Sequence, residues 1–132
     1  MAEVGLSASV ITIVDLLVKV GVLCSEYCRD VKSARREFSS LLNEADMLNA
    51  TLEVVGKLLS SSNKQKIESS RKIRRSIVDC RLLLNSLTAK LEQGTTWRLM
   101  VWPFKKGEVA GVVEKLRRYR EAISVDLQIN QA

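Results

Sequence analysis

The sequence predicts an all-α protein, an antiparallel four-helix bundle with a short extra helical turn before the last helix. Apolar residues recur at steps of three and four along most of the chain, and the 132 residues include only one proline and six glycines. Proline and glycine are the residues that most disfavour helix interiors, so their scarcity favours long helices. Short connections between four helices favour an antiparallel bundle. We expect one domain, 1–132, with helices at about 4–28, 33–60, 64–93 and 106–130.

The first helix is apolar around most of its circumference, and we therefore expect it to be the most buried of the four. Its polar residues Thr12, Asp15, Lys19 and Glu26 form only a narrow stripe. About 20 apolar residues would cross a bilayer, but a charge near the middle, as at Asp15 or Lys19, costs about 2.5–3.5 kcal/mol. Permanent membrane spanning is therefore disfavoured. Two alternatives remain: a helix buried among the other three, or one that is buried in one state and contacts lipid in another.

Two continuous apolar seams predict the second and third helices. The first seam comprises Val31, Ala34, Phe38, Leu41, Ala45, Leu48, Leu52, Val55 and Leu59. The second comprises Ile73, Ile77, Cys80, Leu84, Leu87 and Leu91. Asp30 or Ser33 is placed to cap the second helix. Ser62 and Gln65 have the spacing of a capping box, and the third helix begins between residues 63 and 70.

A third seam predicts the last helix, and it comprises Val109, Val112, Leu116, Tyr119, Ile123 and Leu127. Gly94 ends the preceding helix and Pro103 prevents its continuation, which leaves a short helical turn or loop at 97–104. We expect the aromatic residues of this connector to pack as a lid over the end of the bundle, the alternative being contact with a bilayer interface. Gly107 and Gly111 are spaced to permit tight packing near the start of the last helix.

The composition argues against catalysis. The chain has no histidine, which excludes Ser-His-Asp and Cys-His nucleophiles and histidine metal sites. Cys24, Cys28 and Cys80 are odd in number and no recognisable signal peptide is present, so we expect a reducing, intracellular compartment. We interpret the three as small buried hydrophobic residues, with a metal or redox role as the alternative. No phosphate-binding loop or metal-like pair of carboxylates occurs, so we predict no enzyme, cofactor or metal.

The net charge of +6 is concentrated in the second half of the chain. Six basic residues form a cluster that we call the basic cluster: Lys64, Lys66, Arg71, Lys72, Arg74 and Arg75. Bases near a helix N-terminus oppose the helix dipole, so local stability does not explain them. Binding to acidic lipids does, and a solvated face is the alternative. Nucleic acid is disfavoured because aromatic residues are only 5% of the chain and no nucleic-acid-binding motif is present.

Several stretches of the sequence resemble a known family. AEVGLSASVI at 2–11, followed by an apolar helix, and SARRE at 33–37 resemble the N-terminal domain of fungal NOD-like (STAND) receptors. WPFKKGEV at 102–109 and the helix with LQI at 127–129 are similar to the segment that closes the HeLo-like version of that domain. The resemblance covers essentially the full chain. It implies the N-terminal helical bundle of a longer receptor, followed by a nucleotide-binding oligomerisation module or ankyrin repeats.

The resemblance also implies a function, regulated cell death executed at membranes. The membrane-active helix would comprise Leu6, Val10, Ile11, Ile13, Val14, Leu16, Leu17, Val20 and Leu23. Glu3 and Asp15 are candidate pore-lining or insertion-limiting acids, although Asp15 and Lys19 are also spaced as an i,i+4 ion pair. The implied partners are anionic membrane lipids and, on activation, further copies of the chain. The domain would be cytoplasmic at rest and at the plasma membrane when activated.

Two other functions are compatible with the same sequence. One is a signalling or adaptor bundle that self-associates without lysing membranes, with its first helix permanently in the core. The other is a basic bundle that binds nucleic acid, which only the charge supports. Leakage of liposomes and electrophoretic mobility of nucleic acid separate the three.

Overall fold

The computed structural model describes residues 5–95 and 103–131, and within them all regular secondary structure is helical. The helices are α1 (Leu6–Asp30), α2 (Ala34–Leu59), α3 (Lys64–Ser69), α4 (Arg71–Thr95) and α5 (Glu108–Gln131). The predicted all-α class is confirmed. Four of these helices are long, and the five pack against each other.

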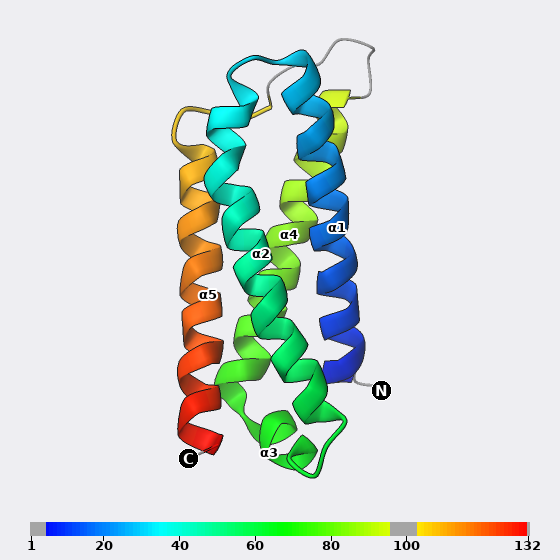
Figure 1. Ribbon diagram of the computed structural model, residues 1–132, viewed down its shortest axis with the longest axis vertical. Helices are drawn as coiled ribbons and strands as arrows, with labels where there is room; N and C mark the ends of the chain where they lie inside the picture. The colour runs from blue at the N-terminus through cyan, green and yellow to red at the C-terminus, as the bar shows by residue number, and fades with distance from the viewer. Residues whose placement is uncertain (1–4, 96–102, 132) are drawn as a thin grey trace.

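The long helices lie side by side, with both α1 and α5 in contact with α2 and α4 (Figure 1). In Figure 1, α1 and α4 run upward while α2 and α5 run downward. Each long helix therefore has one neighbour that runs against it and one that runs with it. Short α3 carries the chain from α2 to α4 across one end of the molecule, which we call the α3 end; α1 begins at this end and α5 finishes there.

The predicted apolar seams form the core. Every residue of the second and third helices' seams is buried except Val31, which is partly buried. In the last helix the seam is rotated slightly from the prediction, because Val113 is buried whereas Val112 and Tyr119 are only partly buried. Burial of these stripes supplies the main stabilising free energy of such a fold, at about 25 cal/mol per Å² of apolar surface.

The prediction of one continuous helix at 64–93 is wrong, because the chain breaks at Ser70. This residue has an extended backbone, with φ −74° and ψ 112°. Its hydroxyl oxygen accepts a hydrogen bond from the backbone N–H of Ile73 at 3.2 Å, and its O–H donates to Asp126 on α5. Serine satisfies a free N–H group of the first helical turn in this way. Ser70 therefore starts α4 and ties that start to α5.

Three other local predictions at helix starts need correction. The capping box at Ser62 and Gln65 does not form, since α3 starts after Asn63 and has no side-chain cap hydrogen bond. Ser33 does precede α2, as predicted, but its side chain makes no cap hydrogen bond. Gly111 does not mark tight packing, because a Cβ added there would meet no atom within 4 Å.

The connector before α5 is described only from Pro103 onward, and residues 103–105 are not helical. The predicted short helical turn at 97–104 therefore lies largely outside the described residues. Gly107 precedes α5 with a φ of +80°, a conformation that glycine adopts without steric cost. This glycine turns the chain into α5.

Candidate membrane-binding and docking surfaces

Nine residues of α1 were predicted to form a membrane-active helix. In the structure they are divided between the core and the surface. Six of them are buried: Leu6, Val10, Ile13, Leu17, Val20 and Leu23. Val14 and Leu16 are partly buried against the core. Ile11 alone among the nine is largely exposed. In this structure the helix therefore shows only a small part of its predicted membrane-active face to solvent.

The opposite side of α1 carries an apolar stripe that faces solvent. Ile11 is 62% exposed, Val18 63% and Val22 55%, and their spacing of seven and four residues places them on one line. We call these three residues the α1 stripe. Sequence reasoning missed Val18 and Val22. The first helix was expected to be the most buried, but within the described residues α1 is buried to about the same extent as α2 and α4. The helix is long and apolar enough to cross a membrane, yet only 39% of its most apolar window is buried.

The polar residues of α1 lie beside the apolar α1 stripe, and one of them, Lys19, contacts α4. Thr12, Asp15 and Lys19 are all exposed. The ammonium of Lys19 lies 2.9 Å from a carboxylate oxygen of Glu92 on α4, and both side chains are about half exposed. Lys19 therefore has an ion-pair partner on another helix. Glu3, the other candidate acid, lies outside the described residues.

A groove lies between α1 and α2, and we call it the α1–α2 groove. Its volume is about 290 Å³, and its lining residues are Val14, Leu17, Val18, Gly21, Leu42, Ala45, Asp46 and Asn49. A Cβ added at Gly21 would meet no atom within 4 Å, so the groove is open at this point. The floor is apolar, while Asp46 places a carboxylate in its wall. The α1–α2 groove can therefore receive apolar side chains with basic neighbours.

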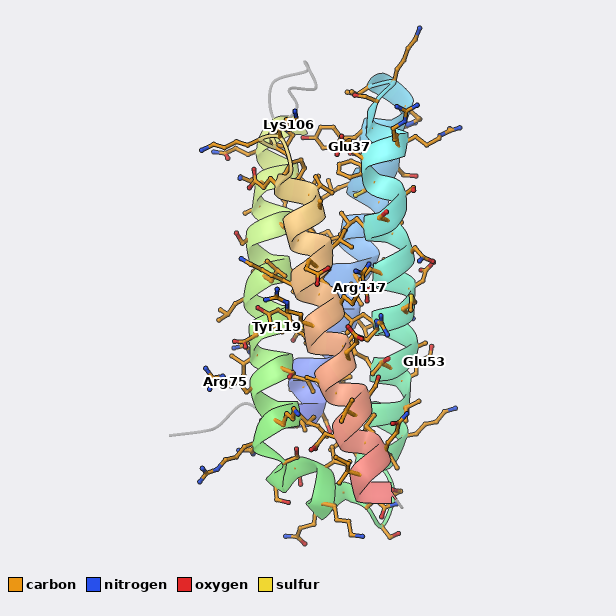
Figure 2. The ribbon with its side chains drawn as sticks, turned by 90° about the vertical axis from the view of Figure 1, so that its left-hand side faces the viewer. Glu37, Glu53, Arg75, Lys106, Arg117 and Tyr119 are labelled. Atoms are coloured by element: carbon orange, nitrogen blue, oxygen red, sulfur yellow. The ribbon has the colours of Figure 1, made fainter. Side chains whose placement is uncertain are left out.

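The basic cluster is exposed at the α3 end of the molecule. All six side chains face solvent, and within the described residues none of them lies in an ion pair. Lys64 and Lys66 lie on α3, and the other four lie at the start of α4. Figure 2 shows Arg75 projecting away from the helices near this end. The structure therefore gathers all six predicted bases at one end, where α1 also begins.

A buried carboxylate ties α2 to α5. Glu44 is only 3% exposed, and Arg120 donates hydrogen bonds to both of its carboxylate oxygens, with Arg117 at 3.7 Å. Arg117 also donates to Glu114 at 3.0 Å. The hydrogen bonds from Arg120 to Glu44 raise the pKa of the arginine further. Sequence reasoning missed this cluster. Glu44 lies next to the seam residue Ala45, and nothing in its sequence position indicates that an arginine of α5 lies opposite it.

Aromatic residues close the other end of the molecule. Tyr27 donates its hydroxyl hydrogen to the carbonyl oxygen of Leu91 at 3.0 Å. The rings of Tyr27 and Phe38, and of Phe38 and Phe104, meet edge to face with centroids 5.9 and 6.0 Å apart. The lid predicted for the connector is thus confirmed at Phe104, while Trp97 and Trp102 lie outside the described residues. Lys90 lies 5.9 Å from the Phe104 ring centroid.

The cysteines pack in or near the core. Cys24 and Cys80 are buried, and burial raises the pKa of each thiol to about 12. Cys28 is partly buried against the same core. In residues 5–95 and 103–131, no three cysteine, aspartate or glutamate side chains come together as a metal site would require. Burial of Cys24 and Cys80 confirms the prediction of small buried hydrophobic groups for these two residues, whereas Cys28 is only partly buried.

The chain has no match among family models, curated proteins or solved structures. Three features of its surface bear on its function: the α1 stripe, the α1–α2 groove and the basic cluster.

Proposed function

We propose that this chain is a HeLo-like four-helix bundle built from two antiparallel hairpins, and that it acts as the membrane-targeting, cell-death-inducing N-terminal domain of a fungal immune receptor. The observation that carries this function is the α1 stripe. A helix with the length and apolar character of a membrane span leaves Ile11, Val18 and Val22 in water. A helix that served only the core would bury such side chains, because each contributes about 1.5–3 kcal/mol when fully buried.

The charge of the molecule supports an anionic membrane as the partner. The basic cluster and the start of α1 lie at the same end of the molecule (Figure 1). Each basic residue near an anionic surface contributes about 1 kcal/mol, and this attraction acts over about one Debye length, near 8 Å at physiological salt. The cluster would hold the α3 end at the headgroups while the α1 stripe contacts the acyl boundary.

Deeper insertion of α1 would require a change of structure. Six of its apolar residues are in the core, so they reach lipid only if α1 separates from α2 and α4. Association with the membrane surface therefore precedes insertion, and copies brought together on activation would supply the inserted helices. The domain would be cytoplasmic at rest and would act without catalysis, a cofactor or a metal.

The test compares two variants of equal charge. The first replaces Lys64, Lys66, Lys72 and Arg74 by Gln, and the control replaces Lys32, Arg35, Lys105 and Lys106, which are exposed near the other end. Co-sedimentation with anionic and neutral vesicles is measured at low and high salt, together with dye leakage. We expect the first variant to lose up to about 4 kcal/mol of binding to anionic vesicles and the control to lose clearly less. An equal loss in both would contradict a role for the basic cluster.

A second function is favoured by the α1–α2 groove. An open apolar groove with a carboxylate in its wall is also what an adaptor bundle would use to bind a protein segment. An adaptor would leave vesicles intact and unbound at every salt concentration. Nucleic acid remains disfavoured, and an electrophoretic mobility assay at physiological salt tests it directly.

A further inference from the structure

Two surfaces on different helices of this chain are complementary to each other. The first is the wall of the α1–α2 groove on α2, together with its continuation along the helix as far as Glu53, beyond the groove itself. Leu42, Asp46, Asn49 and Glu53 follow one another at steps of four, three and four residues, so they lie on one line along the helix. Asp46 and Glu53 are exposed, and Leu42 is partly buried. This wall is apolar toward the start of α2 and acidic toward its end.

The second surface is a ridge on α4. Arg71, Arg75, Val78 and Leu82 also follow one another at steps of four, three and four residues. Val78 is 42% exposed and Leu82 58%, and both arginines are exposed. We call these four residues the α4 ridge. The ridge is basic toward the start of α4 and apolar toward its middle, and no ion pair holds its arginines within the described residues.

The two surfaces present these features in the same order along the molecule. α2 ends near the α3 end and α4 begins there, so on each surface the charged residues lie nearer that end than the apolar residues of the same surface do (Figure 1). The apolar residues of both surfaces lie farther from it. Figure 2 shows Glu53 and Arg75 projecting from opposite sides of the molecule at similar heights. Two copies placed side by side in the same orientation, and displaced along the helix axes, would therefore bring acid to base and apolar to apolar.

We propose that the α4 ridge of one copy docks into the α1–α2 groove of a second copy of this chain. Val78 and Leu82 enter the groove beside Val18 and Gly21, where the missing side chain of the glycine leaves open space. Arg71 and Arg75 face the acidic wall. A bound pair keeps one free groove on one copy and one free ridge on the other, so the contact is heterologous and builds an open chain or a ring.

Charge also argues against a symmetric dimer through either surface. Two grooves placed face to face would bring Asp46 and Glu53 against the same acids of the other copy or, with the copies antiparallel, against its apolar residues. Two ridges would oppose Arg71 and Arg75 in the same way. Like charges placed against each other at an interface cost several kcal/mol, whereas complementary patches also steer association. The pairing of ridge with groove is therefore the one favoured by the charges. It goes beyond the proposed membrane function and stands without it.

The test is sedimentation velocity in the absence of lipid, with reductant to keep the cysteines as thiols. The groove variant carries Asp46→Lys and Glu53→Lys, and the ridge variant carries Arg71→Glu and Arg75→Glu. We expect the unmodified chain to associate with increasing concentration and less so at high salt. Each variant alone should be monomeric. An equimolar mixture should associate again, because the ridge of the groove variant meets an intact acidic groove on the other variant.

Recovery on mixing also shows that both variants are folded. A matched pair of apolar variants completes the test: Val78→Ser on the ridge should weaken association several-fold, while Val54→Ser, at a residue 43% exposed on another face of α2, should not. An unmodified chain that stays monomeric at every concentration and salt, a mixture that fails to associate, or equal effects of the two serine variants would overturn the ridge-in-groove contact. The four-glutamine variant used with vesicles keeps Arg71 and Arg75, so failure of lipid binding and failure of docking are separate results.

Discussion

At the residue scale, Glu44 is a charged side chain whose burial the apolar seams did not predict. It lies beside Ala45 in the buried stripe of α2. Its carboxylate points toward α5 and forms ion pairs with Arg117 and Arg120. A seam predicts which side of a helix is buried, and it contains no information on which helix lies across it. The identity of the neighbour decides whether a flanking carboxylate reaches water or an arginine. Burial of this carboxylate therefore became visible only in the folded chain.

Glu44→Gln should lower the free energy of unfolding by about 3 kcal/mol, because breaking a buried ion pair leaves Arg120 without its partner. The measurement is urea denaturation followed by circular dichroism, with the slope m checked for constancy. Glu114→Gln is the control, since Glu114 is half exposed beside Arg117 and such pairs contribute about 0–1 kcal/mol. Equal effects of the two variants would mean that Glu44 contributes no more than a surface ion pair.

Glu108 gives a pH-dependent contribution at the other end of the molecule. Hydrogen bonds from Lys90 and from the backbone N–H of Lys105 lower the pKa of its carboxyl below the usual 4.5. Its carboxylate therefore stabilises the fold above the pKa of the unfolded chain, and this contribution is lost as pH falls through the lower pKa of the folded state. We expect Glu108→Gln to lower Tm at neutral pH, with the difference disappearing in acid. Glu53→Gln is the control. If Glu108→Gln still lowers Tm in acid, the electrostatic origin of the effect is contradicted.

At the element scale, the helices themselves could largely be predicted from the sequence. Seams such as Phe38 to Leu59 depend only on the 3.6-residue period of a helix, and nearly all their residues are buried. The break at Ser70 could not be placed, because serine is compatible with both a helix interior and an N-cap. Its hydrogen bond with Asp126, 56 residues away in the chain, selects the cap. The exposure of Val18 was also missed because it depends on distant parts of the chain: hydropathy does not show how many sides of a helix are covered by other helices.

Two glycines at the start of α5 should respond oppositely to alanine. Gly111→Ala is expected to stabilise the fold by about 0.5–1 kcal/mol, because the added Cβ meets no atom within 4 Å and alanine loses less backbone entropy in a helix. Gly107→Ala is expected to destabilise it by about 1–2 kcal/mol, because φ is +80° there. Thermal denaturation of both variants, monitored at the helical signal, checks the two signs. The same sign for both would show that the turn before α5 is not held by Gly107.

At the scale of the whole molecule, charge is divided unequally between the two halves of the chain. Residues 1–59 carry a net charge of −2 and residues 60–132 a net charge of +8. This division could be read from the sequence, but its consequence for docking depends on which helices are neighbours. Because α1 packs beside α4 and α2 beside α5, the acidic wall and the basic ridge lie on different sides of one molecule. The charged residues of the candidate surfaces could therefore be identified from the sequence, whereas the side of the molecule on which each surface lies could not.

The last prediction separates the core role of α1 from its membrane role by using two neighbouring turns of the same helix. Leu17→Asp places a charge in the core and should unfold the protein or lower its stability by several kcal/mol. Ile11→Asp changes a residue that is largely exposed and does not line the α1–α2 groove, so fold and self-association should be retained. A charge in place of an apolar contact with lipid costs about 3 kcal/mol, which corresponds to roughly a 100-fold loss of binding to anionic vesicles. Vesicle co-sedimentation and thermal denaturation of Ile11→Asp together check this. A folded Ile11→Asp variant that binds and permeabilises vesicles like the unmodified chain would remove the α1 stripe from the membrane contact and leave α1 as a core helix.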